Sequence, residues 1–81
     1  MKQDHSKHEC RSAQDLHGDV LVWIIKNAEV WRFFSTMDVR FGVLGQNDYC
    51  EDDRLSGVMQ RLQRERKIRY RHSYRKWQRI A

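Results

Sequence analysis

The strongest constraint on the fold is a helical pattern of apolar residues in the C-terminal part of the chain. Four of them recur at positions i, i+3, i+4 and i+7, the spacing that places side chains on one face of an α-helix: Leu55, Val58, Met59 and Leu62. Asp52 or Asp53 can cap this helix, which we expect to span residues 53–67. The opposite face carries Gly57, Gln60 and Arg64, flanked by Ser56, Arg61 and Lys67. The pattern predicts a helix that buries one apolar face and exposes a polar, basic one.

This helix lies in a strongly basic part of the chain. Residues 54–81 contain eight Arg and two Lys against a single acid, Glu65, a net charge of +9, whereas residues 1–53 carry six Lys or Arg and ten Asp or Glu, a net charge of −4. Cationic side chains gain affinity for a polyanion by releasing its condensed counterions, and a guanidinium pairs with phosphate oxygens or base edges at two points. An ordinary solvated surface would mix both signs. The basic block therefore predicts a binding face for a polyanion.

Length and composition argue against several other classes of protein. With 81 residues the chain can form one small core, which leaves little room for a substrate pocket, so we do not expect an enzyme. The longest apolar run, Val20 to Ile25, has six residues, whereas a membrane-spanning helix needs about 20. The N-terminus lacks the apolar segment of a signal peptide, and two cysteines are too few to staple a secreted scaffold. We expect a cytoplasmic protein without membrane contact.

The N-terminal residues read as a tail followed by a helix. Residues 1–13 are polar and lack periodicity, which predicts a flexible tail ahead of a single domain at residues 14–81. The tail and its neighbourhood hold four potential metal ligands whose spacing matches no structural zinc pattern, so we expect neither metal nor cofactor: His5, His8, Cys10 and His17. Residues 15–28 follow helical spacing, with Leu16, Val20, Trp23 and Ile24 on one face and Leu21, Ile25 and Ala28 on the adjoining one. Such a broadly apolar helix should be central.

A short strand and a second helix are expected next. Residues 29–34 are rich in strand-forming residues and too few for a helix. Ser35 and Asp38 have the spacing of a capping box, which predicts a helix over residues 36–44 that ends at Gly45. We expect this helix to bury Met37, Phe41 and either Leu44 or Val43. Residues 46–53 are polar and acidic, which predicts a loop in which Cys50 is an incidental thiol.

The last residues fit a β-hairpin. Residues 68–71 alternate apolar and basic side chains, His72 and Ser73 can form a turn, and residues 74–80 return. A hairpin of this kind should point its arginines outward, pack on the helices and pair with the strand at residues 30–34. An alternative stays open, because Tyr70, Tyr74, Trp77 and Ala81 also fit helical spacing. That version would extend one basic helix from residue 54 onward.

The order of these elements is similar to that of the winged helix-turn-helix family. Residues 54–69, RLSGVMQRLQRERKIR, resemble its recognition helix running into the first strand of the wing, and residues 36–44 resemble the preceding helix. The resemblance implies an α+β, mainly α, three-helix domain with a C-terminal hairpin, of a kind common in small bacterial and phage regulators. Two features depart from the family. Arg66 stands where the family often has Gly, so it should be strained or extend the helix, and the turn between the two helices is longer than usual.

These patterns together predict sequence-specific binding of double-stranded DNA by a small, nucleoid-associated transcriptional regulator. The helix at residues 53–67 would enter the major groove and turn four side chains to base edges: Ser56, Gln60, Arg61 and Arg64. The helix ends and the wing at residues 68–80 would hold phosphates through six cations: Arg54, Lys67, Arg69, Arg71, Arg75 and Lys76. Two alternatives remain, an arginine-rich helix that binds RNA and a winged module that binds another protein. Val22, Trp23 and Trp31 exceed what one small core can bury, which suggests a homodimer.

Overall fold

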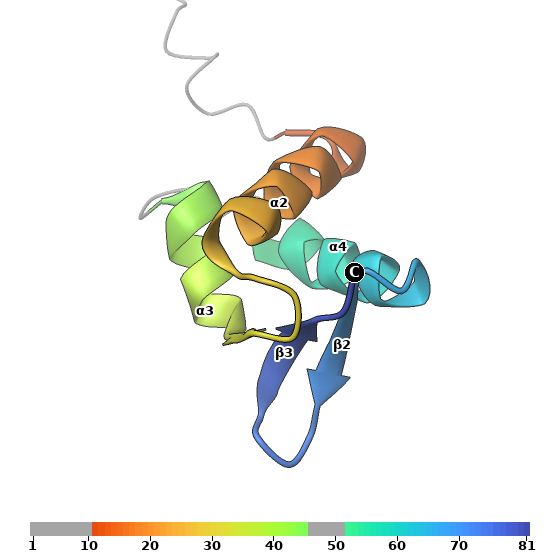
Figure 1. Cartoon of the computed structure of the whole chain (residues 1–81). Coiled ribbons are helices and arrows are strands. Elements are labelled where there is room, and N and C mark those ends of the chain that lie inside the picture. The colour runs from red at the N-terminus through yellow and green to blue at the C-terminus, as the bar shows by residue number, and fades with distance from the viewer. Residues whose placement is uncertain (1–10, 46–51) are drawn as a thin grey trace, which may run out of the picture.

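The computed structural model describes residues 11–45 and 52–81, and within them it confirms an α+β fold that is mainly helical (Figure 1). Helix α2 packs across α4, with α3 on its other side, and the C-terminal hairpin projects from the helices (Figure 1). The elements follow in the order α2 (Ala13–Asn27), β1 (Phe33–Phe34), α3 (Thr36–Val39), the π-helical turn η1 (Arg40–Leu44), α4 (Asp52–Arg64), β2 (Ile68–Arg71) and β3 (Lys76–Arg79). Residues 1–10 of the expected tail and residues 46–51 of the expected loop, including Cys50, lie outside the described residues.

Helix α2 begins two residues before the expected start. The hydroxyl of Ser12 accepts a hydrogen bond from the backbone N–H of Asp15 at 3.1 Å and so caps the helix. Arg11 also belongs to the folded part, because its guanidinium donates to Asp19 and to the carbonyl of Val43. The prediction of a tail through residue 13 was therefore wrong at its last three residues. The cap stabilises a first helical turn that apolar periodicity alone does not reveal.

The apolar face of α2 is narrower than the sequence pattern suggests. One row of side chains is buried, Leu16, Val20, Ile24 and the adjacent Ala28, while Leu21 and Trp23 are half-buried. Ile25, expected on a buried adjoining face, is 52% exposed. The helix contacts α4, α3 and η1, and Ile25 lies on the part of its surface that none of them covers.

The capping box of α3 is confirmed. The backbone N–H of Asp38 donates to the Ser35 hydroxyl at 3.0 Å, and the N–H of Ser35 donates to the Asp38 carboxylate at 3.1 Å. The expected burial of Met37 and Phe41 was wrong, since they are 54% and 56% exposed. Leu44, one of the two alternatives expected at the end of the helix, is buried as predicted, and Val39 is buried in addition. A regular α-helix places residues four apart on one face, whereas the wider π turn that begins at Arg40 brings residues five apart into line, so Leu44 follows Val39 into the core.

Gly42 allows η1 to approach α2 closely. A methyl group at this position would overlap the indole nitrogen of Trp23. The Trp23 ring also meets Phe34 edge-on, with ring centroids 6.2 Å apart. These contacts join α2, η1 and the start of the sheet beside the main core.

The stripe on α4 is confirmed, because Leu55, Val58, Met59 and Leu62 are all buried. The helix ends at Arg64, three residues earlier than expected, and Arg66 adopts a left-handed conformation with φ of 62°. The N–H of Arg66 donates to the carbonyl of Gln63 and that of Lys67 to the carbonyl of Leu62, which closes the helix end. Of the two expectations for Arg66, strain and not helix extension is the one observed.

Arg66→Gly should raise the free energy of unfolding by roughly 0.5–1 kcal/mol. Glycine adopts positive φ without the steric cost that a β-carbon imposes, although part of this gain is offset by the greater freedom of glycine in the unfolded chain. Thermal or urea unfolding measures the change. Arg66→Ala removes the same charge and keeps the β-carbon, so it should show no gain; equal stabilisation of both variants would assign the effect to charge.

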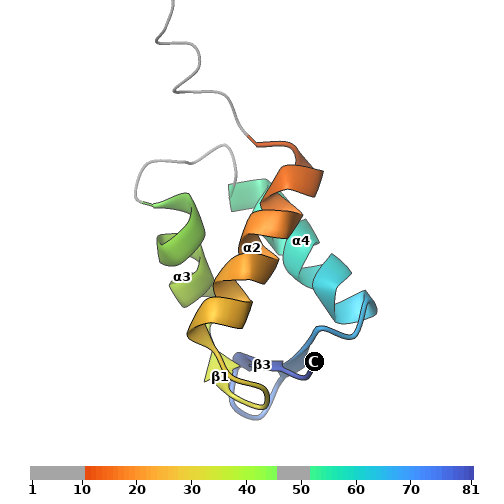
Figure 2. The same ribbon diagram turned by 45° about the horizontal axis from the view of Figure 1, so that its top comes forward.

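The C-terminal residues form strands, and the alternative of one long basic helix was wrong. The sheet has the order β1-β3-β2 and is antiparallel, with Phe34 opposite Trp77 and Ile68 opposite Arg79. Figure 2 shows β1 beside β3 below the helices. Ile68 and Trp77 are buried, which gives the hairpin an anchor on the helices that an isolated hairpin would lack. The pairing with the segment at residues 30–34 is confirmed, at its last two residues.

Positive φ angles shorten two of the expected strands. Trp31 has φ of 76°, which interrupts extended backbone and leaves β1 with only Phe33 and Phe34. Arg75 has φ of 56°, so the hairpin loop covers residues 72–75 and β3 begins at Lys76, two residues later than expected. The N–H of Trp31 donates to the carbonyl of Arg79 in β3, that of Arg75 donates to the carbonyl of His72 within the loop, and neither position is marked by glycine.

Candidate nucleic-acid interface

The exposed face of α4 carries most of the side chains that the sequence nominates as base readers. Ser56, Gln60 and Arg64 are exposed, as is Gly57, whose α-carbon has open space around it. These residues lie on the side of the helix away from the buried stripe. The face combines hydroxyl, amide and guanidinium groups with a position of minimal bulk, so a base edge could approach it closely.

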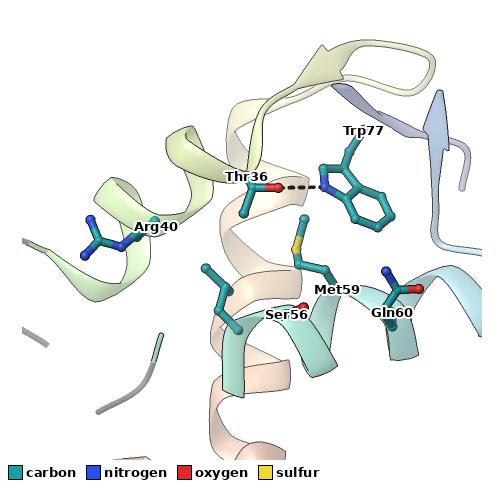
Figure 3. Close-up of a pocket in the computed structure, with 7 residues that line it drawn as sticks. Thr36, Arg40, Ser56, Met59, Gln60 and Trp77 are labelled. Carbon is teal, nitrogen blue, oxygen red and sulfur yellow. Dashed lines mark hydrogen bonds between the residues drawn. The ribbon is translucent and has the colours of Figure 1, made fainter. Parts of the chain in front are cut away.

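A hollow adjoins this face between α4, α3 and the sheet (Figure 3). Ser56, Met59 and Gln60 line it from α4, and the indole N–H of Trp77 donates to the Thr36 hydroxyl at 2.8 Å across its far side (Figure 3). That hydrogen bond ties the start of α3 to β3. Side chains of the helices and of the hairpin therefore line the hollow together.

Arg40 is a residue of this site that the sequence analysis missed. It lines the same hollow from η1, across from Ser56 and Gln60 (Figure 3). Thr36 and Arg40 are four residues apart and so share a helix face. The spacing of Thr36 and Arg40 could have shown that the two side chains lie on one face of the helix. Which face of this helix turns toward α4 depends on how α3 packs.

Arg61 lies on a different side of α4 from Ser56. The two positions are about 140° apart around the helix at 3.6 residues per turn. The Arg61 guanidinium donates to the Glu65 carboxylate at 3.1 Å, and His17 of α2 contacts the other oxygen of Glu65 at 2.8 Å. Arg54 lies about two helical turns earlier on the same side of α4, and its guanidinium donates to the carbonyl of Arg11 at 2.7 Å. Arg54 and Arg61 therefore form a basic edge on the side of α4 that faces α2.

The charge of Glu65 is stabilised by this cluster. The hydrogen bond from His17 lowers the pKa of the Glu65 carboxyl below its usual value, and Arg61 lowers it further through its own hydrogen bond and charge. Because the folded state holds Glu65 with a lowered pKa, the stabilisation is present at neutral pH and is lost as the pH falls through that pKa. Glu65 thus orients Arg61 and links α2 to the end of α4.

The wing supplies the second group of cations. The five predicted phosphate contacts that follow α4 are Lys67, Arg69, Arg71, Arg75 and Lys76. None of the five forms an ion pair with another residue in the part of the chain that the structure describes. Strand alternation directs Arg69, Arg71 and Lys76 away from the buried Ile68 and Trp77. The outward direction expected for the hairpin arginines therefore holds for β2.

Arg79 is the exception among the basic residues of the hairpin. Its guanidinium donates to the carbonyl of Ala28 at 2.8 Å and to that of Ala81 at 2.8 Å. The bond to Ala28 joins β3 to the end of α2. Arg79 is therefore a structural residue, and we do not count it among the phosphate contacts.

Large apolar side chains remain exposed on α2 and in the segment that follows it. Val22 is 52% exposed and Trp31 is 63% exposed, whereas Trp23 is half-buried against Gly42. The excess of apolar surface inferred from the sequence is thus present at two of the three named residues. The homodimer stays a prediction.

Two further observations concern residues 11–45 and 52–81. No three His, Cys, Asp or Glu side chains are grouped there so as to hold a metal ion, and His5, His8 and Cys10 fall outside these ranges. None of the helices described is long and apolar enough to cross a membrane. Comparison of the chain with protein-family models, curated proteins and solved structures found no match.

Proposed function

We propose that this protein binds double-stranded DNA, with α4 in the major groove and the β2–β3 hairpin acting as a wing on the adjacent backbone. The arrangement of three helices and a C-terminal hairpin supports a winged helix-turn-helix role. A small, nucleoid-associated transcriptional regulator is the biological role that we infer from it.

The observation that carries the proposal is the distribution of charge around α4. Uncharged Ser56 and Gln60 are exposed on the helix, while cations lie on two sides of it. One side has Arg54 and Arg61, and the other borders Trp77 of the hairpin that carries the wing cations. A major groove is about 12 Å wide and is bordered by a phosphate backbone on either side, so this distribution matches its chemistry.

The roles of individual residues follow from their places. Ser56, Gln60 and Arg64 would contact base edges, with Arg40 reaching the same groove from η1. Lys67, Arg69, Arg71, Arg75 and Lys76 would hold phosphates on the side of the wing. We now place Arg61 with Arg54 as contacts to the opposite backbone, because Glu65 holds its guanidinium on the side of α4 that faces α2.

Titration of duplex DNA at increasing salt tests the proposal. If about six cations neutralise phosphates, log affinity should fall against log salt with a slope near −5, on the order of −0.9 per contact. Between about 50 and 200 mM salt this slope corresponds to a loss of affinity of about a thousandfold. Fluorescence anisotropy with a labelled duplex measures it.

Matched charge variants show which surface is responsible. Arg71→Ala should flatten the slope by about one unit, whereas Lys26→Ala, on the exposed side of α2, should leave it unchanged. Undetectable binding at low salt, or a slope near zero, would contradict the proposal and would favour a module that binds another protein. The RNA alternative has lost its main support, because no helix continues beyond Arg64 into the wing.

A further inference from the structure

We propose that the outer face of the sheet is a second nucleic-acid site, which stacks unpaired bases of a single strand on Phe33 and Tyr74. We use "outer sheet face" for the outward side chains Phe33, Tyr74, Arg69, Arg71 and Lys76. This inference goes beyond duplex binding by α4, because it concerns two further contact residues, Phe33 and Tyr74, and a different form of nucleic acid.

The first observation is an exposed pair of aromatic rings. Phe33 of β1 and Tyr74 of the hairpin loop are far apart in the sequence, yet their ring centroids lie 5.0 Å apart with an interplanar angle of 52°. The two side chains remain 41% and 64% exposed. A pair that served only to brace the loop would be expected to bury more of its apolar surface. Here a substantial part of both rings stays open to a ligand.

The second observation is the set of cations on the same side. In β1, Phe34 is buried and Phe33 points the other way, and the register places Phe33 beside Gln78 and Gln78 beside Arg69. The next outward pair toward the loop is Lys76 and Arg71. The outward residues of the three strands thus include three cations and no acid. Cations around exposed aromatic rings match the charge of a nucleic-acid backbone and the flat faces of its bases.

The chemistry of stacking selects single strands. In a duplex each base is covered by its neighbours, so its flat face is not available to a protein ring except at an end or where a base is displaced. An unpaired base exposes both faces, and stacking on an aromatic side chain contributes without regard to sequence. The outer sheet face should therefore bind single strands with little sequence preference.

The aromatic pair is separate from the base-reading face of α4, whereas Arg69, Arg71 and Lys76 are shared with the proposed phosphate contacts of the wing. Ile68 and Trp77 on the inner side of the hairpin are buried against the helices, and the outer sheet face is on the opposite side of the same strands. The aromatic pair contains no residue that we assign to base reading by α4. Substitutions in the pair can therefore be tested without changing the proposed major-groove contacts.

Binding of a labelled twelve-residue oligothymidylate to the full chain tests the inference. Fluorescence anisotropy should detect binding by the wild-type protein, and Tyr74→Ala should weaken it about tenfold or more. Tyr74→Trp keeps a stacking ring and should retain most of the affinity. Phe41→Ala removes an aromatic side chain that is 56% exposed on η1, and it should have no effect. An oligomer of the same length that lacks bases should bind weakly, and equally to wild type and Tyr74→Ala.

Several outcomes would overturn the inference. They are the absence of oligothymidylate binding, equal effects of Tyr74→Ala and Phe41→Ala, and a loss in Tyr74→Trp as large as in Tyr74→Ala. The last result would show that Tyr74 acts by bracing Phe33. Duplex binding is measured alongside, with Arg64→Ala expected to weaken it while leaving oligothymidylate binding intact. If oligothymidylate does not bind but duplex binding keeps its salt slope, the proposed function stands and the stacking site is rejected. If oligothymidylate binds but the duplex does not, only the duplex proposal is rejected.

Discussion

Leu62→Ala should lower the free energy of unfolding by roughly 2–5 kcal/mol, the largest effect on stability that we expect of a single substitution here. Leu62 has no exposed surface and belongs to the buried cluster that also contains Ile24, Met59 and Trp77. Truncation removes the transfer energy of the lost methyl groups and leaves a cavity between helices and sheet. Small domains have total stabilities of about 5–15 kcal/mol, so much of the fold's stability could be lost. Urea unfolding followed by circular dichroism measures the change.

Arg64→Ala is the matched control for this prediction. Arg64 lies two residues further along α4 and is exposed on the opposite side of the helix. Its truncation should change stability by no more than about half a kcal/mol. Equal losses in the two variants would contradict the orientation of α4, and with it the whole set of residues proposed to face DNA.

Arg64→Ala and Gln60→Ala should each weaken binding to the preferred DNA site by roughly 1–3 kcal/mol and affect random duplexes much less. Both side chains are exposed on the face of α4 that we place in the major groove. A guanidinium or an amide that pairs with one base edge loses that pairing on other sequences, so the effect is specific to the site. Selection from a random duplex pool supplies the preferred site, and anisotropy titrations on both duplexes measure the two affinities.

Wing variants supply the contrasting result. Arg71→Ala and Arg75→Ala remove phosphate contacts, so they should weaken binding to all duplexes by similar factors. If the wing variants change sequence preference while the α4 variants do not, the wing is the reader and α4 the positioning element.

Local sequence patterns were sufficient for the main elements of the fold. The stripe Leu55, Val58, Met59 and Leu62 and the capping box of Ser35 and Asp38 each lie within eight residues, and both appear in the structure as expected. The alternation at residues 68–71 likewise predicts the strand that is observed. In each case the interacting residues are neighbours in the chain, so the pattern alone specifies their geometry.

The places where the sequence reasoning was wrong depend on contacts between distant residues. Phe41 and Leu44 are equally apolar, and the π turn at Arg40 decides that Leu44 enters the core. α4 ends at Arg64, and Arg66 then adopts a left-handed backbone that no glycine in the sequence signals. Apolar periodicity reports which residues can be buried, whereas packing decides which of them are.

The sequence by itself determined the chemistry of this protein, and the tertiary structure decided how that chemistry is arranged. The sequence shows the basic C-terminal part, the helix with one apolar face and the capping box of Ser35 and Asp38. The fold alone places Arg40 and Gln60 on the lining of one hollow, brings His17 to Glu65, and brings Phe33 to Tyr74. The physical reason is that these pairs join separate elements or depend on helix rotation. Their distances are set by how side chains fill the core between those elements, which periodicity within one element does not encode.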